Sequence, residues 1–449
     1  MGAITGVYLG LRVWSFVGIA GHASSFPDTP EYENVKKLSV FSLDFWTWYK
    51  PWGSALLWKL LPGSTDVSAP IGQWLISIVA WLTLAIVVFR VLEHWPVKFA
   101  GFGLVLAFSM VPAVAVWDGA LLSESLTLSI AALLVAALLL FVQEPAWKWA
   151  AAVLLLAFLL AGTRSTNGYL APFLLIPVAA IVLRRSGWIG VSVAVGSLAI
   201  AGIAYASANV RQWQVPLAEI VAGRVLQKPS EQAYFVARGM PVRPSLAQDI
   251  WSHRIPLDAF ETTPSLAYFM PWFNRSGRAV YTDYLLSHPG DALVDPIRDI
   301  TAMIAPSPST QDLQGLPVSI YAAQGYRAGL PSVLARVLYW SNAKLLLTFA
   351  ILSLLALGTL AAMGLTRVVW TIPVLLLASC VPHAIIVWNG DDTSIGRHAL
   401  LLAILFRLGL LIVLLYIADA YLTDRRRVAS TEPNRAEQAA PKQLGNKVS

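Results

Sequence analysis

Long apolar runs recur along almost the whole chain and constrain its fold more than any other feature. A helix that crosses a bilayer needs roughly 20 mainly apolar residues. Runs close to that length lie at 3–20, 70–89, 99–116, 122–142, 149–162, 169–183, 188–207, 342–362, 368–388 and 399–421. The pattern therefore predicts an all-α polytopic membrane protein with about ten transmembrane helices.

The composition fits a chain that is covered by lipid. Only 13% of the residues are charged and 57% are hydrophobic, whereas a soluble domain carries about 25% charged residues. The net charge of +7 does not indicate a nucleic-acid partner, because the chain has no basic tract interleaved with aromatic residues. The single cysteine, Cys380, excludes an intrachain disulfide. No small-residue cleavage site follows the first run, so we expect a retained helix there.

Basic residues in the short connections predict which side of the membrane each connection faces, because Lys and Arg gather on the cytoplasmic side. With a cytoplasmic N-terminus, every inner connection is basic. The inner basic residues are then Arg90, Lys98, Lys148, Arg184, Arg185, Arg367, Arg425, Arg426 and Arg427. This orientation puts a long connection, 208–341, on the outer face between spans seven and eight.

Four units follow from this threading. We expect an N-terminal transmembrane module with functional outer loops at 1–207, and an extracytoplasmic loop unit at 208–341. C-terminal transmembrane helices at 342–422 and a disordered cytoplasmic tail at 423–449 complete the chain, because the tail is polar and rich in Ala, Pro, Gln and Asn. The apolar stretch 52–61 is too short to span and is predicted to be re-entrant or interfacial.

Polar and charged clusters gather on the predicted outer face, although they were not used to set the orientation. The first outer loop carries three carboxylates within six residues, among them Asp28 and Glu31. Such a cluster at a membrane surface can hold a raised pKa or bind a cation. The alternative is a helix N-cap, with Asp28 before Pro30 and Glu31 at the capping-box position.

Three shorter outer turns add further candidates: Asp118 and Glu124, Arg164 and Asn167, and Asp391, Arg397 and His398. Arg397 and His398 can donate paired hydrogen bonds to a phosphate. Ordinary alternatives are a carboxylate at a helix N-terminus, an arginine that reaches lipid headgroups and an Asp-rich loop. Arg12 and Arg407 lie inside predicted spans and are expected to pair with a carboxylate or line a cavity.

The arrangement resembles the GT-C glycosyltransferases, multispanning enzymes that use polyprenyl-phosphate sugars as donors. Their acidic motif after the first span is similar to the run at Asp28, which here is Asp-x-x-Glu rather than two adjacent acids. Further similarities are Lys50-Pro51, Ser123-Glu124-Ser125-Leu126, His288-Pro289 and the Asp391…Arg397-His398 run. The motifs are short, and none names one sugar or one acceptor.

The resemblance implies transfer of a sugar from a polyprenyl-phosphate donor to a cell-envelope glycan, lipid or protein, with inversion at the anomeric carbon. Asp28 or Glu31 would be the general base, and Arg397, His398, Arg164 and Lys50 would bind the donor phosphate. The acceptor would be oriented by Asp118, Glu124, Asn167 and Asp391. The spacing of the motifs requires no cofactor, and it neither requires nor excludes a bound divalent cation. The implied location is the bacterial plasma (inner) membrane, with the site on the extracytoplasmic face.

Two other classes of function fit the sequence. A membrane transporter or lipid flippase would need ionisable residues near the bilayer midplane and broken helices in paired positions. Here the polar residues lie mostly at the outer ends, and the chain has no internal repeat. A non-catalytic scaffold of the cell envelope is the other alternative.

Overall fold

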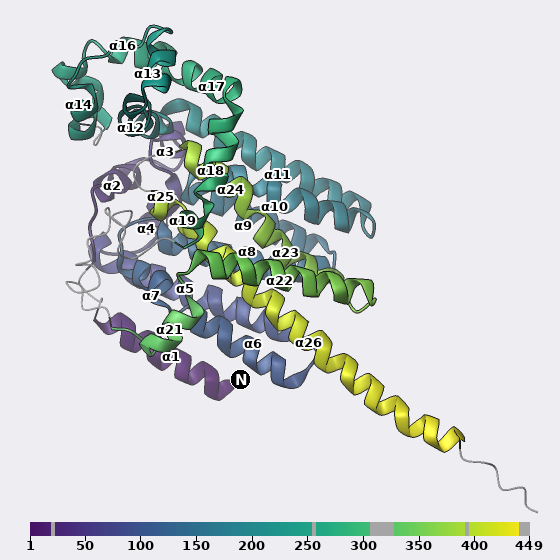
Figure 1. The fold of residues 1–449 in the computed structure, drawn as a ribbon. Coiled ribbons are helices and arrows are strands. Elements are labelled where there is room, and N and C mark those ends of the chain that lie inside the picture. The colour runs from purple at the N-terminus through teal and green to yellow at the C-terminus, as the bar shows by residue number, and fades with distance from the viewer. Residues whose placement is uncertain (19–22, 254–256, 306–326, 391–394, 440–449) are drawn as a thin grey trace, which may run out of the picture.

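The computed structural model describes residues 1–18, 23–253, 257–305, 327–390 and 395–439, with side chains as far as residue 424. The described chain is helical except for its turns and an isolated bridge between Ser24 and Ala120. A long bundle of apolar helices carries a smaller group of helices at one end (Figure 1). The predicted all-α class is therefore confirmed.

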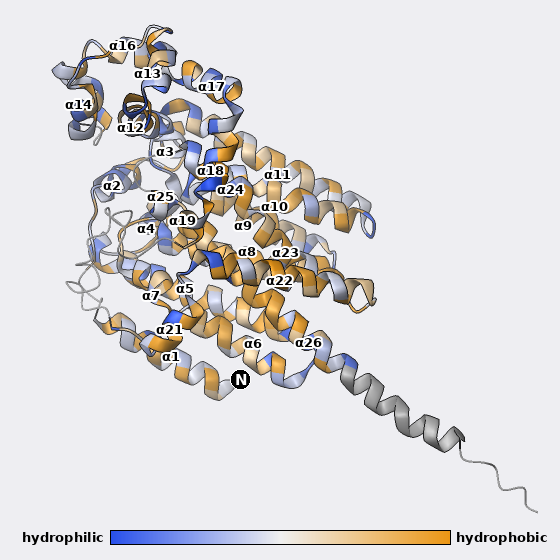
Figure 2. Ribbon diagram, viewed as in Figure 1, coloured by the Kyte–Doolittle hydropathy of each residue, from blue (hydrophilic) through white to orange (hydrophobic). Residues whose placement is uncertain are grey.

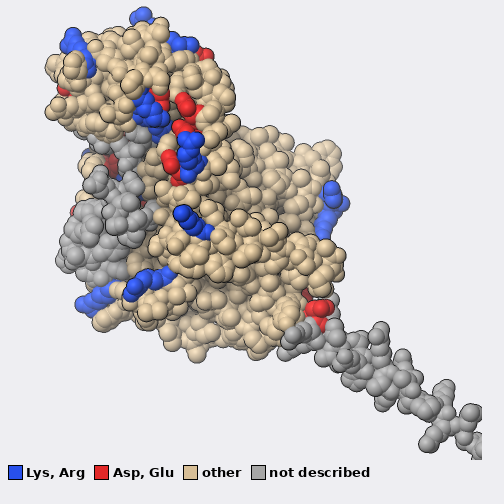
Figure 3. All heavy atoms as spheres, viewed as in Figure 1, with Lys and Arg blue, Asp and Glu red and all other residues tan. Residues whose placement is uncertain are grey.

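Seven helices of the described chain are long and apolar enough to cross a membrane. They are α5 (Thr65–Val91), α8 (Glu124–Gln143), α10 (Ser165–Leu183), α11 with its continuation (Gly187–Gln212), α22 (Ala343–Ala362), α23 with α24 (Val368–Gly390) and the first part of α26 (Leu400–Asp424). The bundle is orange over its length, and few charges break its visible side (Figures 2 and 3). The chain thus has the features of a multi-pass membrane protein.

The remaining predicted spans also fall on helices, but on shorter or broken ones. Helices α1 (Gly2–Val17) and α9 (Trp147–Thr163) have 16 and 17 residues. Helix α6 (Trp95–Phe108) is followed by α7 (Pro112–Ala115) and a 3-10 turn (Val116–Gly119) after a bend of 58°. The bend has a local cause, because Val111 precedes a proline and is extended, with ψ of 143°. A count of ten spans stays a prediction.

Helix α8 forms the centre of the bundle. Of its most apolar 18-residue stretch, 89% is buried within the protein, between α5 on one side and α9 on the other. Its sequence is rich in alanine and serine as well as leucine. Small side chains let neighbouring helices approach closely, which favours packing where lipid supplies no hydrophobic driving force. The outer end of α8 is therefore rigidly placed.

The outer group of helices has a hydrophobic core of its own. Helices α12 (Gln214–Gly223), α13 (Pro229–Val236), α14 (Leu246–His253), α15 (Leu257–Thr262), α16 (Met270–Trp272) and α17 (Arg278–Ser287) surround a cluster that includes Phe235, Phe260, Phe269 and Phe273. Figure 2 shows more hydrophilic residues in these helices than in the bundle. The predicted boundaries 208–341 include more chain than this core, because α19 (Ile300–Ile304) packs into the bundle.

Arg407 fastens the end of the outer segment to the last span. Its guanidinium donates to the backbone carbonyls of Ile304 at 2.5 Å, Trp340 at 2.6 Å and Ala403 at 2.9 Å. The same group lies 4.0 Å from the centre of the Tyr339 ring. Of the two alternatives predicted for Arg407, a carboxylate partner or a cavity, the first is not seen among the described residues, where carbonyl dipoles and an aromatic face accompany this buried cation. Helix α26 itself continues as far as Ala439.

Candidate functional site

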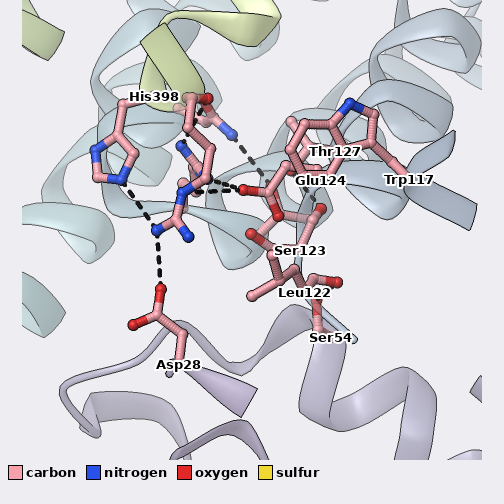
Figure 4. Close-up of polar contacts among 12 residues, drawn as sticks. Asp28, Ser54, Trp117, Leu122, Ser123, Glu124, Thr127 and His398 are labelled. Atoms are coloured by element: carbon pink, nitrogen blue, oxygen red, sulfur yellow. Dashed lines mark hydrogen bonds and ion pairs between the residues drawn. The ribbon is translucent and has the colours of Figure 1, made fainter. Parts of the chain in front are cut away.

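Five charged residues from separate segments meet in one ion-paired cluster, which we call the outer cluster after the side of the membrane that the sequence predicts for it. It consists of Asp28, Lys50, Glu124, Arg164 and Arg397. Each lies at or near the start of a helix. Asp28 precedes α2 (Thr29–Lys37), Lys50 precedes α4 (Trp52–Leu60), Glu124 begins α8 and Arg164 precedes α10. Arg397 lies in the short helix α25 (Ile395–His398), which precedes α26. In the view of Figure 4, Asp28 lies below, Glu124 lies to the upper right and His398 lies to the upper left of the site. The sequence predicted all five as site residues.

Asp28 occupies the centre of the outer cluster. One carboxylate oxygen accepts from the ammonium of Lys50 at 2.9 Å, and the other accepts from the guanidinium of Arg397 at 2.8 Å. Asp28 stands at the N-cap position of α2, but its side chain makes no capping hydrogen bond. Both oxygens therefore serve the ion pairs, and capping does not explain this residue.

Hydrogen bonds fix the loop that carries Asp28. The hydroxyl of Thr29 donates to the carbonyl of Leu121 at 2.9 Å and accepts from the amide of Phe26 at 2.9 Å. A little earlier, the amide of Ser24 donates to the carbonyl of Gly119, also at 2.9 Å. The first outer loop is thereby attached to the turn that leads into α8. This attachment sets the position of Asp28 relative to Glu124.

Glu124 and the two arginines form the other half of the outer cluster. The carboxylate of Glu124 accepts from Arg164 and lies 3.5 Å from the Nε of Arg397. Arg164 also donates to the carbonyl of Arg397 at 3.4 Å. The second oxygen of Glu124, Oε2, is buried and has no hydrogen-bond partner among the described residues. A buried acceptor without a partner is uncommon in proteins and is a reason to look for a ligand.

Burial and charge act in opposite directions on Asp28, which is only 7% exposed. Burial by itself would raise the pKa of this carboxyl, but Lys50 and then Arg397 outweigh it and hold the pKa below its usual range. For Lys50, burial would lower the pKa, and the charge of Asp28 raises it above the usual value. Both groups are therefore charged over the whole physiological range.

We expect these shifts to give a defined dependence of stability on pH. The contribution of Asp28 is complete above the pKa of an unfolded aspartate, about 3.9, and is lost as pH falls through its lower folded pKa. The contribution of Lys50 is complete below about pH 10 and is lost as pH rises through its raised folded pKa. The thermal unfolding midpoint should thus change little from about pH 5 to 9 and fall in acid. An Asp28→Asn variant should show a smaller acid fall, and an equal fall would contradict this account.

The other predicted site residues lie in different surroundings. Glu31 is buried, one helical turn after Asp28, and its Oε2 accepts from Asn34 at 3.3 Å. Burial, followed by the charge of Glu31, raises the pKa of the nearby Tyr49 phenol above its usual value. Asn167 donates to the hydroxyl of Thr163 at 3.1 Å and so lies within its own helix pair. Asp391 lies outside the described residues.

Asp118 belongs to a second, separate buried network. It lies 2.6 Å from a guanidinium nitrogen of Arg12, and each residue is 2% exposed. The hydroxyl of Ser125 donates to Asp118 at 2.5 Å, and Arg12 also donates to Ser77 at 2.9 Å. The expectation that Arg12 pairs with a carboxylate is confirmed. Asp118 therefore supports the turn before Glu124 rather than lying in the outer cluster.

Gln73 is a polar residue of this network that the sequence reasoning missed. Its amide donates to the carbonyls of Asp118 at 3.2 Å and Ala120 at 2.9 Å, and its oxygen accepts from the Trp58 indole at 3.3 Å. A glutamine inside the apolar run 70–89 was a signal that could have found it, because an amide in a span needs partners. Gln73 ties α4 and α5 to the same turn.

Two small hollows lie near the outer cluster. One, of about 10 Å³, is lined by Glu124, Thr127, Arg164, Arg397, His398 and Leu400. The other, of about 20 Å³, is a narrow, mainly apolar groove between α4, α9, α10 and α11, lined by Trp52, Phe158, Gly162, Ile200 and Ile203 among others. Ligand sites usually enclose about 300–1,000 Å³. A large ligand therefore requires both hollows to widen.

Close backbone contact forms one wall of the apolar groove. A Cβ atom on Gly53 would lie 2.7 Å from the carbonyl oxygen of Gly162, and one on Gly162 would lie 2.4 Å from the Trp52 ring. Glycine at both positions lets α4 lie directly on α9. Pro51 and Ser165, which also line the groove, directly follow Lys50 and Arg164. Two lining residues of the apolar groove are thus sequence neighbours of outer-cluster residues.

Within the described ranges, no group of three or more His, Cys, Asp or Glu side chains is placed to hold a metal ion. The acidic residues of the outer cluster are instead neutralised by Lys and Arg. No protein-family model matches this chain, and no curated protein matches it either. The similarity to GT-C enzymes accordingly rests on the short sequence motifs alone.

Proposed function

We propose that this protein is an integral membrane glycosyltransferase of the GT-C type, which moves a sugar from a polyprenyl-phosphate donor to an acceptor on the extracytoplasmic face. The observation that carries the proposal is the buried carboxylate of Asp28 held between Lys50 and Arg397. A narrow apolar groove is lined by Pro51 and Ser165, which directly follow Lys50 and Arg164 in the chain. Transfer from such a donor needs a carboxylate as the base, cations for the phosphate and an apolar channel for the lipid chain.

The cations of the outer cluster suit a phosphate. Three cations, Lys50, Arg164 and Arg397, are ion-paired with two carboxylates, Asp28 and Glu124, so the paired groups carry one excess positive charge. Arginine donates to phosphate oxygens as a planar fork, and lysine adds a point charge. In the reaction these residues would stabilise the negative charge that develops on the departing polyprenyl phosphate.

Binding of the donor would also prepare Asp28. Both of its oxygens are occupied by cations, and its lowered pKa makes it a weak base. A phosphate that attracts Lys50 and Arg397 would draw them from the carboxylate and restore its basicity. Asp28 could then accept the proton of the acceptor hydroxyl while the new bond to the anomeric carbon forms. At the same time the bond between that carbon and the phosphate oxygen breaks, and its electron pair stays on the oxygen of the departing polyprenyl phosphate.

The apolar groove offers a course for the lipid chain. It extends from Pro51 and Ser165 along Trp52, Phe158 and Ile203, and Ile203 is 52% exposed on the outside of the bundle. The donor could therefore enter sideways from the bilayer while its phosphate reaches the outer cluster. We further propose about ten spans, a bacterial inner membrane and a cell-envelope glycan, lipid or protein as the acceptor.

The test is to incubate the purified protein in nanodiscs with a panel of radiolabelled polyprenyl-phosphate sugars and an extract of envelope glycans. We expect turnover of one donor, with release of the unglycosylated lipid phosphate, and loss of turnover in Arg397→Gln. Consumption of no donor would contradict the proposal. Transfer of the intact donor between leaflets without cleavage would instead support the flippase alternative.

A further inference from the structure

The outer loop between α2 and α5 presents apolar side chains that are strongly exposed in the described part of the protein. Phe41 is 97% exposed, Leu43 75% and Leu60 73%, and Phe41 is the most exposed large apolar side chain of the described chain. These residues are not part of the outer cluster. Their exposure requires an explanation, because isolated apolar groups are common on surfaces but adjacent ones are not.

The exposure does not come from a loosely held segment. The ammonium of Lys59 donates to the carbonyls of Lys36 and Leu38, both at 2.9 Å, which brings the two ends of the loop together. The Trp46 indole donates to the carbonyl of Val40 at 2.8 Å. Beneath these bonds Phe45 is fully buried in a small apolar core with Trp52. The loop therefore holds Phe41 and Leu43 outward on a fixed backbone.

The loop lies at the level where the spans reach the outer surface. Helix α4 rests on α9 through Gly53 and Gly162, near the outer end of α9. The side chain of Leu61, just after α4, fills the space beside Gly72 in the second turn of α5. This contact places Leu60 beside the outer two turns of a membrane-spanning helix.

The surface below the loop faces lipid. Val67, Ile71, Leu75 and Val79 recur at every fourth position of α5 and are 40% to 59% exposed. Residues spaced by four lie on one face of a helix, so these side chains form a continuous apolar stripe along a span. Leu60 lies next to the outer end of that stripe. Continuity with a lipid-facing surface is the argument for lipid, rather than a protein, as the group that covers the loop.

We propose that the loop between α2 and α5 is a membrane anchor, in which Phe41, Leu43 and Leu60 insert into the outer leaflet. Two exposed cations, Lys37 and Lys59, precede Phe41 and Leu60 in the chain and would lie at the level of anionic headgroups. The same loop continues to Lys50, so insertion fixes the height of the outer cluster relative to the lipid phosphates. This anchor stands whether or not the protein transfers sugars.

The experiment uses the fact that the chain has one cysteine, the buried Cys380. In a Cys380→Ala background, an environment-sensitive fluorophore is attached at Phe41→Cys or Leu43→Cys, and the protein is placed in nanodiscs of phosphatidylethanolamine and phosphatidylglycerol. Val79→Cys on the stripe is the lipid reference, and Ser245→Cys, exposed on the outer unit, is the aqueous reference. Nitroxides attached to the lipids and iodide in the buffer serve as quenchers.

We expect the probes at 41 and 43 to be quenched by the lipid nitroxides as at 79 and to lose the iodide quenching seen at 245. Iodide quenching equal to that at 245 would overturn the anchor. Protection from both quenchers would also overturn it, because a protein partner or a second copy would then cover the loop. Two label positions keep the test decisive if one variant fails to fold.

Discussion

Replacement of Asp28 by asparagine is expected to abolish sugar transfer. Asparagine keeps the shape of the side chain but cannot take a proton from the acceptor, and loss of a general base typically costs about 10²–10⁴ in rate. The residue also receives ion pairs from Lys50 and Arg397 at 2.9 and 2.8 Å. The measurement is turnover of the polyprenyl-phosphate sugar by purified protein in nanodiscs, set against the wild type.

The same substitution should separate binding from chemistry. Without the carboxylate, Lys50 and Arg397 lose the partner that competes with a phosphate, so affinity for the lipid phosphate should be kept or increase. Two uncompensated cations should at the same time destabilise the fold by about 3 kcal/mol, the order expected when one partner of a buried pair is removed. Thermal unfolding of the variant with and without polyprenyl phosphate measures both effects, since a ligand stabilises the state that it binds.

A matched control is Asp44→Asn, which changes an exposed carboxylate in the same outer loop. It should leave transfer, affinity and unfolding unchanged. A fully active Asp28→Asn protein would remove Asp28 as the base and direct attention to Glu31, the second acidic residue of the motif. Loss of transfer together with loss of phosphate binding would instead indicate a general collapse of the site.

The sequence could predict the helices because their signal is local. In the described residues, the ten apolar runs fall mainly on helix, since about 20 apolar residues have no other stable arrangement in lipid. The break after α6 is also present in the sequence as Val111-Pro112, although hydropathy alone predicts a continuous helix over 99–116. Residues such as Arg407 illustrate the limit. Its burial was expected, but its carbonyl partners at Ile304 and Trp340 depend on how distant segments pack.

The candidate site was only partly predictable for the same reason. Charge placement put four outer turns on one face, and that sufficed to propose Asp28, Glu124, Arg164 and Arg397 together, whereas Lys50 was added by the resemblance of Lys50-Pro51 to a GT-C motif. It did not separate them from Asp118, which is only six residues before Glu124 yet joins a different network. Asp118 is held in this other network by Arg12, which lies 106 positions before it in the chain. Pairing over such a distance follows from tertiary packing and leaves no mark on the local motif.

The Arg12–Asp118 pair supports the second large prediction. We expect Arg12→Met and Asp118→Asn each to destabilise the protein by about 3–5 kcal/mol, because each leaves a buried partner without its countercharge. Both side chains are 2% exposed, and their nearest atoms are 2.6 Å apart. The double variant should be less destabilised than the sum of the two single variants by about 1–3 kcal/mol. The measurement is a double-mutant cycle, in which unfolding of the wild type, the two single variants and the double variant is compared in one detergent.

Activity measured on the same four proteins separates two roles for Asp118. If Asp118 acts by holding the turn before Glu124, through Ser125 and the Gln73 contacts, then the double variant should regain part of the transfer rate lost in each single variant. If Asp118 instead orients the acceptor, as the motif alone predicted, then the double variant should be no more active than Asp118→Asn. The geometry favours the first result, because Arg12 and Ser125 already occupy the two carboxylate oxygens and leave little of this carboxylate for an acceptor.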